Sequence, residues 1–545
     1  MSKKLKLISL VLSVAVMISL LGGCVVPAQN SNQPSDLSST TDEKLAFPLK
    51  EQITLRYFAT FGATGTGLNN NGETELFKEL ERRTNIKFEH INAPTADEGQ
   101  TLNLMLAARD VPDIIEDNFG KYPGGINKAK AEGIIIALND YLEEYAPNFN
   151  KLLKEYPEDI GKEISTVNGE YLNLPYVNTD LQVLTIRGLS VRGDWLDELG
   201  MDAPVTIDDW YKMLTAFKEQ KGAERPLALK LEIQSGFLGC ISGAYGIFTR
   251  NKAPFYLDGD TIKFGPYEAV YKDYLQTLHK WYSEGLISKD SPMSTVAQQE
   301  ADFVNGKSGA IEVSAVANTR LSLQGKELKP TFQMRPVPYP VLKEGDKNLF
   351  LYTGKISSLS GKCLCISSTN KHVKESVMFL DYGYTPEGSV LYSFGIEGES
   401  YQKNADGKLE FTDKVVNDPD DRPYTEVLMK YARGSSWGSY TLHPDFGAAM
   451  SLSEEQRESN RAWNIHAEDY IKNKNSAKNK MTDDQNAQYT DIITPIRTYI
   501  AEMFLKFVSG QEPLSNFDQY IQKLKDMRIE EAILLRQLGY YQYLQ

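Results

Sequence analysis

The 545-residue chain is acidic, with 73 Asp and Glu residues against 59 Lys and Arg residues and a formal net charge of −14. This balance argues against nucleic acid as a ligand, because phosphate binding requires clustered basic side chains. The hydrophobic content of 41% is that of an ordinary globular protein, and the length allows two large domains with separate cores.

The first 24 residues have the features of an export signal. Three lysines among the first six residues precede an apolar run from Leu7 to Leu21, which ends in Leu-Gly-Gly-Cys24. A basic head, a short apolar stretch and small residues before a cysteine are typical of a lipoprotein signal peptide. The alternative is an uncleaved membrane helix, for which the run is only marginally long enough. We therefore expect residues 1–23 to be removed and Cys24 to carry the lipid.

Residues 24–48 are predicted to form a disordered tether. The stretch is rich in Ser, Thr, Asn, Gln, Pro and Asp, with too few large apolar residues to offset the entropy of ordering. No later segment approaches 18 uninterrupted apolar residues, and the mean hydropathy of the chain is −0.39. We therefore expect a soluble body that is attached to the membrane only through the lipid on Cys24.

The first globular part alternates short strands with helices of about ten residues. This pattern predicts right-handed crossovers and a parallel sheet. The predicted strands are 53–58, 86–91 and 112–115, and the predicted helices are 74–83 and 101–109.

Later helices and turns are marked by capping and turn residues. Thr206 and Asp209 form a capping box at the start of a helix, and Gly285 ends another helix. Asp-Gly pairs between alternating runs predict two hairpins. The predicted features are a helix start at 192–196, a helix after Thr206, helices at 268–284, 492–508 and 514–527, and hairpins at Asp258-Gly259 and Asp406-Gly407.

Signals for catalysis and for cofactors are weak. Residues 434–438 have the spelling G-x-S-x-G, but a nucleophile elbow needs a preceding strand, and 426–432 looks helical. The five histidines show no metal-ligand spacing, and no phosphate-binding or dinucleotide-binding glycine motif is present. We expect no enzyme activity, no metal and no cofactor.

A partial calcium-loop pattern surrounds the second Asp-Gly pair. Asn404, Asp406, Gly407 and Asp413 match half of such a loop, but Gln402 stands at its first ligand position. A hairpin is therefore the favoured interpretation, and calcium near Asp406 stays open.

Three cysteines remain after Cys24, namely Cys240, Cys363 and Cys365. An odd number excludes a complete disulfide framework. Buried thiols are favoured over a strained local disulfide or a metal pair between Cys363 and Cys365.

Five stretches across most of the chain resemble the extracellular solute-binding proteins of carbohydrate importers (family 1), specifically the large Gram-positive-type lipoprotein branch. No single stretch is decisive, but their order matches that family and they accompany a lipoprotein signal. They are Met105-Leu-Ala-Ala-Arg-Asp-Val-Pro-Asp-Ile-Ile115, Val191-Arg-Gly-Asp-Trp-Leu-Asp-Glu-Leu-Gly200, Trp281-Tyr-Ser-Glu-Gly-Leu-Ile287, Phe303-Val-Asn-Gly-Lys-Ser-Gly-Ala310, and 387–398 with Asn404-Ala-Asp-Gly-Lys408.

The resemblance implies an α/β, two-lobed periplasmic-binding-protein fold (type II-like), whose lobes are joined by hinge crossovers. Crossings are expected near 184–192, 349–355 and Gly395. On that basis lobe 1 comprises 49–187 and 353–395, and lobe 2 comprises 188–352 and 396–545 with the C-terminal helices.

The resemblance also implies a function in which no covalent bond is made or broken. The protein would capture a carbohydrate, an oligosaccharide in the first instance, in an interlobe cleft and deliver it as a monomer to the permease subunits of an ABC importer. It would act on the extracellular face of the bacterial cytoplasmic membrane. The alternatives are a binding protein or sensor for a peptide or another solute, and a secreted glycoside hydrolase, which would need two carboxyl groups facing each other across a cleft.

Candidate ligand-binding residues follow two of the predicted strands, because ligands of open α/β sheets bind beyond the carboxyl ends of strands. The loop at 60–72 offers Thr64, Asn69 and Asn70, although its Gly-rich and Asn-rich composition also fits a plain solvent loop. Glu116, Asp117 and Asn118 hold the corresponding position after 112–115, and there the family resemblance also implies binding.

Five further side chains belong to the lobes. Arg192 is a candidate for a hydrogen bond to the ligand or for an ion pair with a nearby carboxylate. Trp437, with small polar neighbours, is a candidate stacking platform, and Tyr245 is a weaker aromatic candidate. Trp195 and Trp210 lie on apolar helical faces, which favours core packing.

Overall fold

The computed structural model describes most of the chain after the predicted tether. The described residues are 45–61, 67–93, 99–119, 122–178, 187–249, 254–348, 350, 362–420, 422–434, 438–466 and 478–545. The predicted signal peptide and Cys24 lie outside these residues, as do Thr64 and Trp437. Within the described ranges, no helix is both long enough and apolar enough to cross a membrane.

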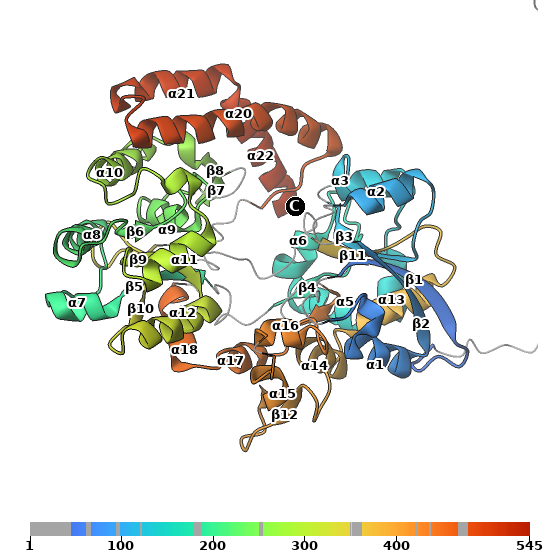
Figure 1. Cartoon of the computed structure of the whole chain (residues 1–545). Helices are drawn as coiled ribbons and strands as arrows, with labels where there is room; N and C mark the ends of the chain where they lie inside the picture. Colours follow the sequence, from blue (N-terminus) through green and yellow to red (C-terminus); the bar gives the residue numbers. More distant parts are fainter. Residues whose placement is uncertain are drawn as a thin grey trace, which may run out of the picture. The chain divides into compact units, whose positions relative to one another are not determined.

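Lobe 1 is built on a four-stranded sheet with the order β11-β3-β1-β2 (Figure 1). β1 pairs in parallel with β2 and with β3, as the alternation of strands and helices predicts. β11 comes from much later in the chain and is antiparallel to β3. The strands are β1 (Ile53–Thr60), β2 (Ile86–Ala93), β3 (Ile114–Asn118) and β11 (Lys362–Ile366).

Helices cover both faces of this sheet. The connection from β1 to β2 and the connection from β2 to β3 run in opposite directions, so right-handed crossovers place α1 and α2 on opposite faces. Figure 1 shows this arrangement. The helices of lobe 1 are α1 (Glu75–Thr84), α2 (Gln100–Ala107), α3 (Gly125–Ala131), α4 (Asn139–Tyr145), α5 (Pro147–Glu155), α6 (Lys162–Ile164), α13 (Val373–Tyr382) and α14 (Pro386–Phe394).

Lobe 2 is built on a second four-stranded sheet with the order β10-β5-β9-β6. β5 is antiparallel to β9 and to β10, whereas β6 is parallel to β9. The carboxyl ends of β6 and β9 therefore lie at one edge together with the amino end of β5, where Arg187 pairs with Ser314. The strands are β5 (Arg187–Arg192), β6 (Leu227–Ala228), β9 (Ala310–Ser314) and β10 (Met334–Val337).

In lobe 2, α8 begins where its capping residues predict, whereas α10 begins at Tyr271, three residues after its expected start. Thr206 and Asp209 form the expected capping box of α8, whose Trp210, Met213 and Phe217 are buried. The Asp258-Gly259 hairpin is formed by β7 (Phe255–Asp258) and β8 (Thr261–Phe264). The helices are α7 (Gly193–Leu199), α8 (Ile207–Lys221), α9 (Gly236–Ala244), α10 (Tyr271–Ser283), the 3-10 helix η8 (Ser291–Met293), α11 (Val296–Val304) and α12 (Ala315–Leu328).

The C-terminal helices extend the core of lobe 2. α20 (Asp483–Ser509) packs on α10, and α22 (Ile529–Leu544) packs on β8 and α20, with α21 (Phe517–Asp526) beside it. α20 begins nine residues before the predicted start, because the capping box of Thr482 and Gln485 initiates two polar turns that lack an apolar stripe. α22 has large apolar residues on all sides, which hides the helical period.

Described residues between 396 and 450, among them Arg433 and Tyr440, contact lobe 1, although the expected exchange near Gly395 assigns them to lobe 2. β14 (Tyr440–Thr441) pairs with β4 (Tyr176–Val177), and α14 packs on β14. α18 (Glu454–Trp463) instead packs on α12, β10 and β5. We therefore propose an exchange between α17 and α18, and the other lobe boundaries stay proposals. The remaining elements are β12 (Tyr401–Lys403), β13 (Leu409–Phe411), α15 (Asp413–Val416), α16 (Tyr424–Leu428) and α17 (Phe446–Met450).

Trp463 attaches α18 to the sheet of lobe 2. Its indole lies on the backbone of Gly188, where an added Cβ would come within 2.3 Å of the ring, and its Nε1 donates to the carbonyl of Leu189 at 3.0 Å. We expect Trp463→Ala to lower the free energy of unfolding by about 3–5 kcal/mol. Trp463→Phe, which keeps most of the ring, should cost only about 1–2 kcal/mol for the lost hydrogen bond. Urea denaturation followed by circular dichroism measures both, and equal losses would contradict this packing role.

Candidate functional site

The carboxyl edge of the lobe 1 sheet carries two buried acidic side chains in succession, Glu116 and Asp117. They lie on β3, whose register places Glu116 beside Ala59 of β1 and beside Leu364 of β11. Successive residues of a strand point to opposite faces, so the two carboxyl groups serve different surroundings.

Glu116 points into the interior. Its Oε2 accepts a hydrogen bond from the Tyr57 hydroxyl at 2.6 Å. The same oxygen forms a hydrogen-bonded ion pair with Arg433 Nη2 at 2.9 Å. Burial and the neighbouring carboxylate raise the pKa of Tyr57 well above its usual range. Burial opposes the charge of Arg433, but Glu116 and Tyr57 more than offset this effect and raise its pKa. The Oε2 atom of Glu116 is thus engaged by two protein groups, which favours a structural role for this residue.

Arg433 also fixes the chain on either side of residues 435–437. The backbone N–H groups of Arg433 and Gly434 donate to the carbonyl of Tyr392. The Tyr440 hydroxyl donates back to the carbonyl of Gly434 at 2.7 Å, and the Tyr440 ring stacks on Tyr392 at 5.1 Å. The described residues 433–434 and 440 are therefore attached to Tyr392 or to each other.

Asp117 lies at the edge where sequence analysis expects ligand contacts. A Cβ added at Gly99 would lie 3.7 Å from its Oδ2, so this carboxyl group is close to the amino end of α2. Asn118 ends β3 and pairs with Lys362 in register. The structure thus brings the backbones of these two predicted residues to the carboxyl edge of lobe 1.

Asn69 and Asn70 make local contacts. The backbone N–H of Asn69 donates to Glu73 Oε2 at 2.9 Å, and Asn70 Nδ2 donates to Glu73 Oε1 at 3.1 Å. The hydrogen bond from the Asn69 backbone lowers the pKa of Glu73, so this carboxylate stays charged and continues to hold both amides. These contacts give the described end of the 60–72 loop a fixed conformation before α1.

Arg192 pairs with a carboxylate, which is the alternative role considered for it. Its Nε and Nη2 donate to the two Asp194 oxygens at 2.8 and 2.7 Å, and its guanidinium lies between Trp195 and Phe332 at 4.6 and 4.3 Å from the ring centroids. It ends β5, at the edge of the sheet opposite the carboxyl end of β9. This placement favours a structural role for Arg192.

The aromatic candidates are placed as follows. Tyr245 directly follows α9, and its hydroxyl shares a 2.6 Å hydrogen bond with Thr277 while its ring makes an edge contact with Tyr274. Trp195 and Trp210 are buried in the core of lobe 2, as their helical spacing predicts.

Lobe 2 contributes a pair at its carboxyl edge that sequence analysis does not single out. Glu312 of β9 accepts from Arg187 Nε at 3.0 Å and from the backbone N–H of Phe237, in the first turn of α9, also at 3.0 Å. The two residues are 125 positions apart, and only the antiparallel pairing of β5 with β9 brings them together. Strand alternation alone gives no signal for this pair.

The expectations about metals and cysteines concern residues that the structure describes in part. No group of three or more His, Cys, Asp or Glu side chains in the described ranges has metal-binding geometry. The Asp406-Gly407 turn joins β12 to β13 in the expected hairpin, where Asn404 Oδ1 accepts from the N–H groups of Asp406 and Lys408. Cys240 and Cys365 are buried and form no disulfide.

Comparison with known proteins gives several curated relatives, two of which are named as binding proteins for carbohydrates. No family model matches the chain. The fructooligosaccharide ABC transporter substrate-binding protein FusA of Streptococcus pneumoniae is 23% identical over 93% of this chain and 94% of its own length. The polygalacturonan/rhamnogalacturonan-binding protein YtcQ of Bacillus subtilis is 25% identical over 63% of this chain and 66% of its own length. Lipoprotein LipO of the same organism is 27% identical over 60% of this chain and 63% of its own length. FusA is named as a substrate-binding protein and YtcQ as a binding protein, in agreement with the expectation of a binding protein.

Solved structures show the same fold. An HMO binding solute-binding protein from Bifidobacterium longum infantis superimposes with a TM-score of 0.70 at 20% identity, over 90% of this chain and 99% of that one. FusA with kestose superimposes with a TM-score of 0.69 at 18% identity, over 90% of this chain and 99% of FusA. The alginate-binding protein AlgQ2 superimposes with a TM-score of 0.68 at 23% identity, over 91% of this chain and 100% of AlgQ2. The chain therefore has the two-lobed α/β fold of solute-binding proteins, as the sequence resemblance implies.

The Glu116–Arg433 pair offers a test of how lobe 1 is held together. Removing one partner of a buried pair leaves an uncompensated charge, so Glu116→Leu should lower the free energy of unfolding by about 3–5 kcal/mol. The double variant Glu116→Leu/Arg433→Leu should recover most of this loss. Chemical denaturation of both variants measures the difference. A double variant as unstable as the single one would contradict the pairing energetics.

His90 makes the stability of the folded chain depend on pH. It lies on β2 against Phe77 at 4.5 Å, and burial, with a smaller effect of Arg433, lowers its pKa to about 4. The unfolded chain takes up this proton at a higher pH than the folded chain, so the stability contribution is complete above pH 6.5 and is lost as the pH falls towards 4. Between pH 7.5 and pH 5 the loss should be about 2 kcal/mol. Thermal unfolding of wild type and His90→Phe at both pH values checks this, and an unchanged difference would contradict it.

Proposed function

We propose that this protein is an extracellular solute-binding lipoprotein that captures a carbohydrate, in the first instance an oligosaccharide, and delivers it to an ABC importer. The observation that carries the proposal is a fold shared over nine-tenths of the chain with proteins whose names state binding of HMO, kestose and alginate. FusA adds sequence similarity along almost the whole chain. These names favour a carbohydrate over a peptide. Membership of family 1, in its large Gram-positive-type branch, is part of the same proposal.

The ligand is proposed to lie between the carboxyl edges of the two sheets. Lobe 1 offers Asp117 there, and lobe 2 offers Arg187 and Glu312, whose side chains are 36% and 13% exposed. Carboxylates accept hydrogen bonds from sugar hydroxyls and a guanidinium donates to them, which suits a ligand with many hydroxyl groups. A solute that contacts both edges favours the closed arrangement of the lobes through its differential contacts, without any covalent step.

Membrane attachment is proposed to rest on the lipid of Cys24. The signal pattern of the first 24 residues supports it, and a relative is named a lipoprotein. The tether would then confine the binding protein to the extracellular face of the cytoplasmic membrane. This confinement would raise its local concentration at the importer.

A glycan panel tests this function. Kestose, nystose, trigalacturonate, an alginate trisaccharide and Man5GlcNAc are each titrated against the purified mature chain, with trialanine as the peptide control. One glycan class should raise the melting temperature by about 2–3 °C at a hundredfold excess over Kd, without releasing reducing ends. Stabilisation by trialanine alone, or turnover of a glycan, would overturn the proposal.

The same titration tests the carboxyl edge of lobe 1. Asp117→Asn should weaken binding of the active glycan by about tenfold or more, since a hydrogen bond to a charged group contributes roughly 1.5–3 kcal/mol. Asp208→Asn is the matched control, because this exposed carboxylate lies on α8 and pairs only with Lys212 one turn away. Equal affinities for the two variants would remove Asp117 from the site.

A further inference from the structure

A short segment before α20 contacts the end of α6. Lys478 Nζ forms an ion pair with Glu163 Oε2 at 3.1 Å, and Lys480 Nζ donates to the Ser165 hydroxyl at 2.6 Å. Lys480 and Ser165 are 315 residues apart in the sequence. The side chains of Lys478 and Glu163 are only 24% and 22% exposed, so salt in the solvent screens their attraction less than that of a surface pair.

The last turn of α22 takes part in the same contact. Lys162 Nζ donates to the backbone carbonyl of Leu544 at 2.9 Å, at the negative end of the helix dipole. The ammonium groups of Lys478 and Lys480 lie 5.6 and 5.9 Å from the centre of the Tyr543 ring, within reach of a cation–π attraction. Lysines from both sides therefore cross the contact. We call Lys162, Glu163, Ser165, Lys478, Lys480, Tyr543 and Leu544 the 163–478 contact.

The two sides of the 163–478 contact belong to different lobes. The chain that follows α6 runs to the lobe 1 sheet, where Leu174 bridges Leu364 of β11. On the other side, the N–H of Lys480 donates to the carbonyl of Gly539 at 2.8 Å, which attaches this segment to α22. α22 in turn packs on α20 and β8 of lobe 2. The contact therefore links the lobes through side chains, far along the chain from the expected crossing near 184–192.

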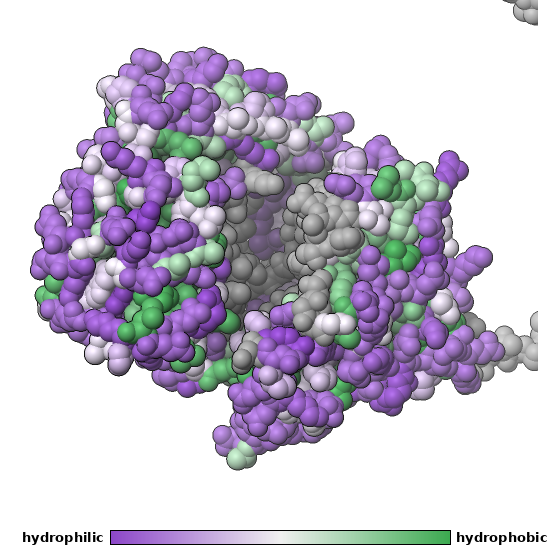
Figure 2. All heavy atoms as spheres, viewed as in Figure 1, coloured by the Kyte–Doolittle hydropathy of each residue, from purple (hydrophilic) through white to green (hydrophobic). Residues whose placement is uncertain are grey.

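The 163–478 contact is polar, so it can separate and form again. Its charged and hydroxyl groups are hydrophilic, as is most of the face of the molecule shown in Figure 2. Separation therefore exposes little apolar surface to water. Partly exposed ion pairs also contribute little stability one by one, so the contact is weak enough to break when the lobes move apart.

The charges within the contact both attract and repel. Burial opposes the charge of Lys478, but Glu163 and Tyr543 more than offset this effect and raise its pKa. Burial and, to a smaller extent, the neighbouring Lys162 lower the pKa of Lys480. Glu163 is thus the carboxylate that balances a group of three lysines, and its replacement by a cation would leave only repulsion between the charged groups named here.

We propose that the 163–478 contact is an interlobe strap that limits how far the two lobes separate in the ligand-free chain. Lobes of a two-lobed protein move as units about a few connecting residues, and a contact remote from those residues restrains this motion. With the strap formed, the free chain samples fewer lobe separations. A solute that binds between the lobes then has less conformational entropy to overcome. This last consequence rests on the proposed function, whereas the strap itself does not.

Distance measurements between the lobes test the strap without any ligand. The ketone amino acid p-acetylphenylalanine replaces Lys151 on α5 of lobe 1 and Lys212 on α8 of lobe 2, whose side chains are 74% and 62% exposed. Each ketone carries a nitroxide label, so the native cysteines stay unchanged. Pulsed electron paramagnetic resonance of the purified mature chain then gives the distribution of interlobe distances.

Charge reversal gives the sharpest variants. Glu163→Lys replaces the attraction to Lys478 by repulsion, so the distances should become longer and their distribution broader. Glu163→Lys/Lys478→Glu restores an opposite pair and should return the distribution to that of wild type. Lys480→Met, which removes the hydrogen bond to Ser165 without adding a charge, should also broaden it. Circular dichroism verifies that each variant is folded.

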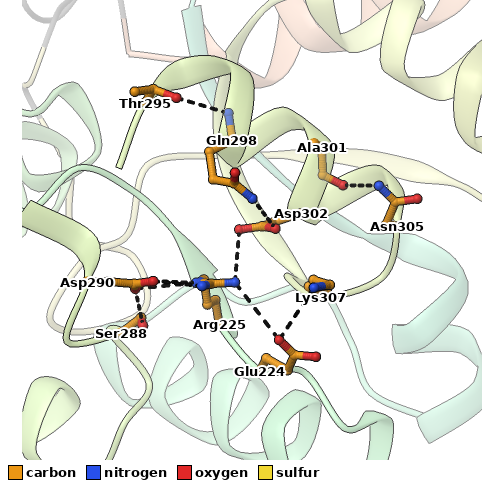
Figure 3. A network of polar contacts seen from close by, with 10 residues as sticks. All are labelled: Glu224, Arg225, Ser288, Asp290, Thr295, Gln298, Ala301, Asp302, Asn305 and Lys307. Carbon is orange, nitrogen blue, oxygen red and sulfur yellow. Dashed lines mark hydrogen bonds and ion pairs between the residues drawn. The ribbon is translucent and has the colours of Figure 1, made fainter. Parts of the chain in front are cut away.

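A reversed pair inside one lobe is the matched control. Asp290→Lys opposes Arg225, which pairs with Asp290 at 2.7 Å in a network within lobe 2 (Figure 3). This variant should leave the interlobe distances unchanged. An unchanged distribution in Glu163→Lys, no recovery in the swapped pair, or the same shift in Asp290→Lys would overturn the inference.

Affinity for the glycan of the panel that the wild-type chain binds measures the consequence for the ligand. Glu163→Lys should weaken binding by about threefold to tenfold, because a smaller fraction of the free chain holds the binding-competent arrangement. The swapped pair should restore the affinity, and equal affinities for wild type and Glu163→Lys would overturn this consequence. If no glycan of the panel binds, only the carbohydrate proposal fails, and the distances still decide the strap.

Discussion

One buried carboxylate, Glu116, joins parts of the chain that are far apart in sequence. It accepts from Tyr57 on the first strand and pairs with Arg433, which is 317 residues away. A buried carboxylate that lost either partner would still be desolvated but no longer compensated. Detaching the segment around Arg433 from lobe 1 would therefore raise the free energy of the folded chain. This contact holds the segment around Arg433 next to β3 beside Asp117, at the edge proposed to meet the ligand.

The lobe 2 sheet also has a carboxylate paired with an arginine near its carboxyl edge, namely Glu312 with Arg187. Glu312 is held by Arg187 and by the first turn of α9, so its carboxylate has a fixed orientation while the Arg187 side chain keeps partial exposure. In the proposed site, engaged polar groups at the two carboxyl edges would form a pre-organised binding surface, because little reorganisation would be needed when a solute arrives. Selection among sugars would then depend on which hydroxyl groups reach these fixed groups.

The structure also separates residues that carry the fold from residues free to act outside it. Arg192, clamped by Asp194 between Trp195 and Phe332, is a stabilising residue of lobe 2. Met293 and Val296, in contrast, contribute little burial and stand on a segment fixed by Arg225 and its carboxylate partners.

The sequence by itself determined the features that depend on nearby residues. The capping box at Thr206, the turn at Asp258-Gly259 and the buried face of α8 follow from local hydrogen bonds and helical spacing, and all are present. Only the tertiary structure decided the pairing of Arg192 with Asp194, the meeting of Arg187 with Glu312 and the attachment of 396–450 to lobe 1. The last two depend on strand register and on contacts between distant segments. Periodicity within a segment carries no information about which other segment it will meet.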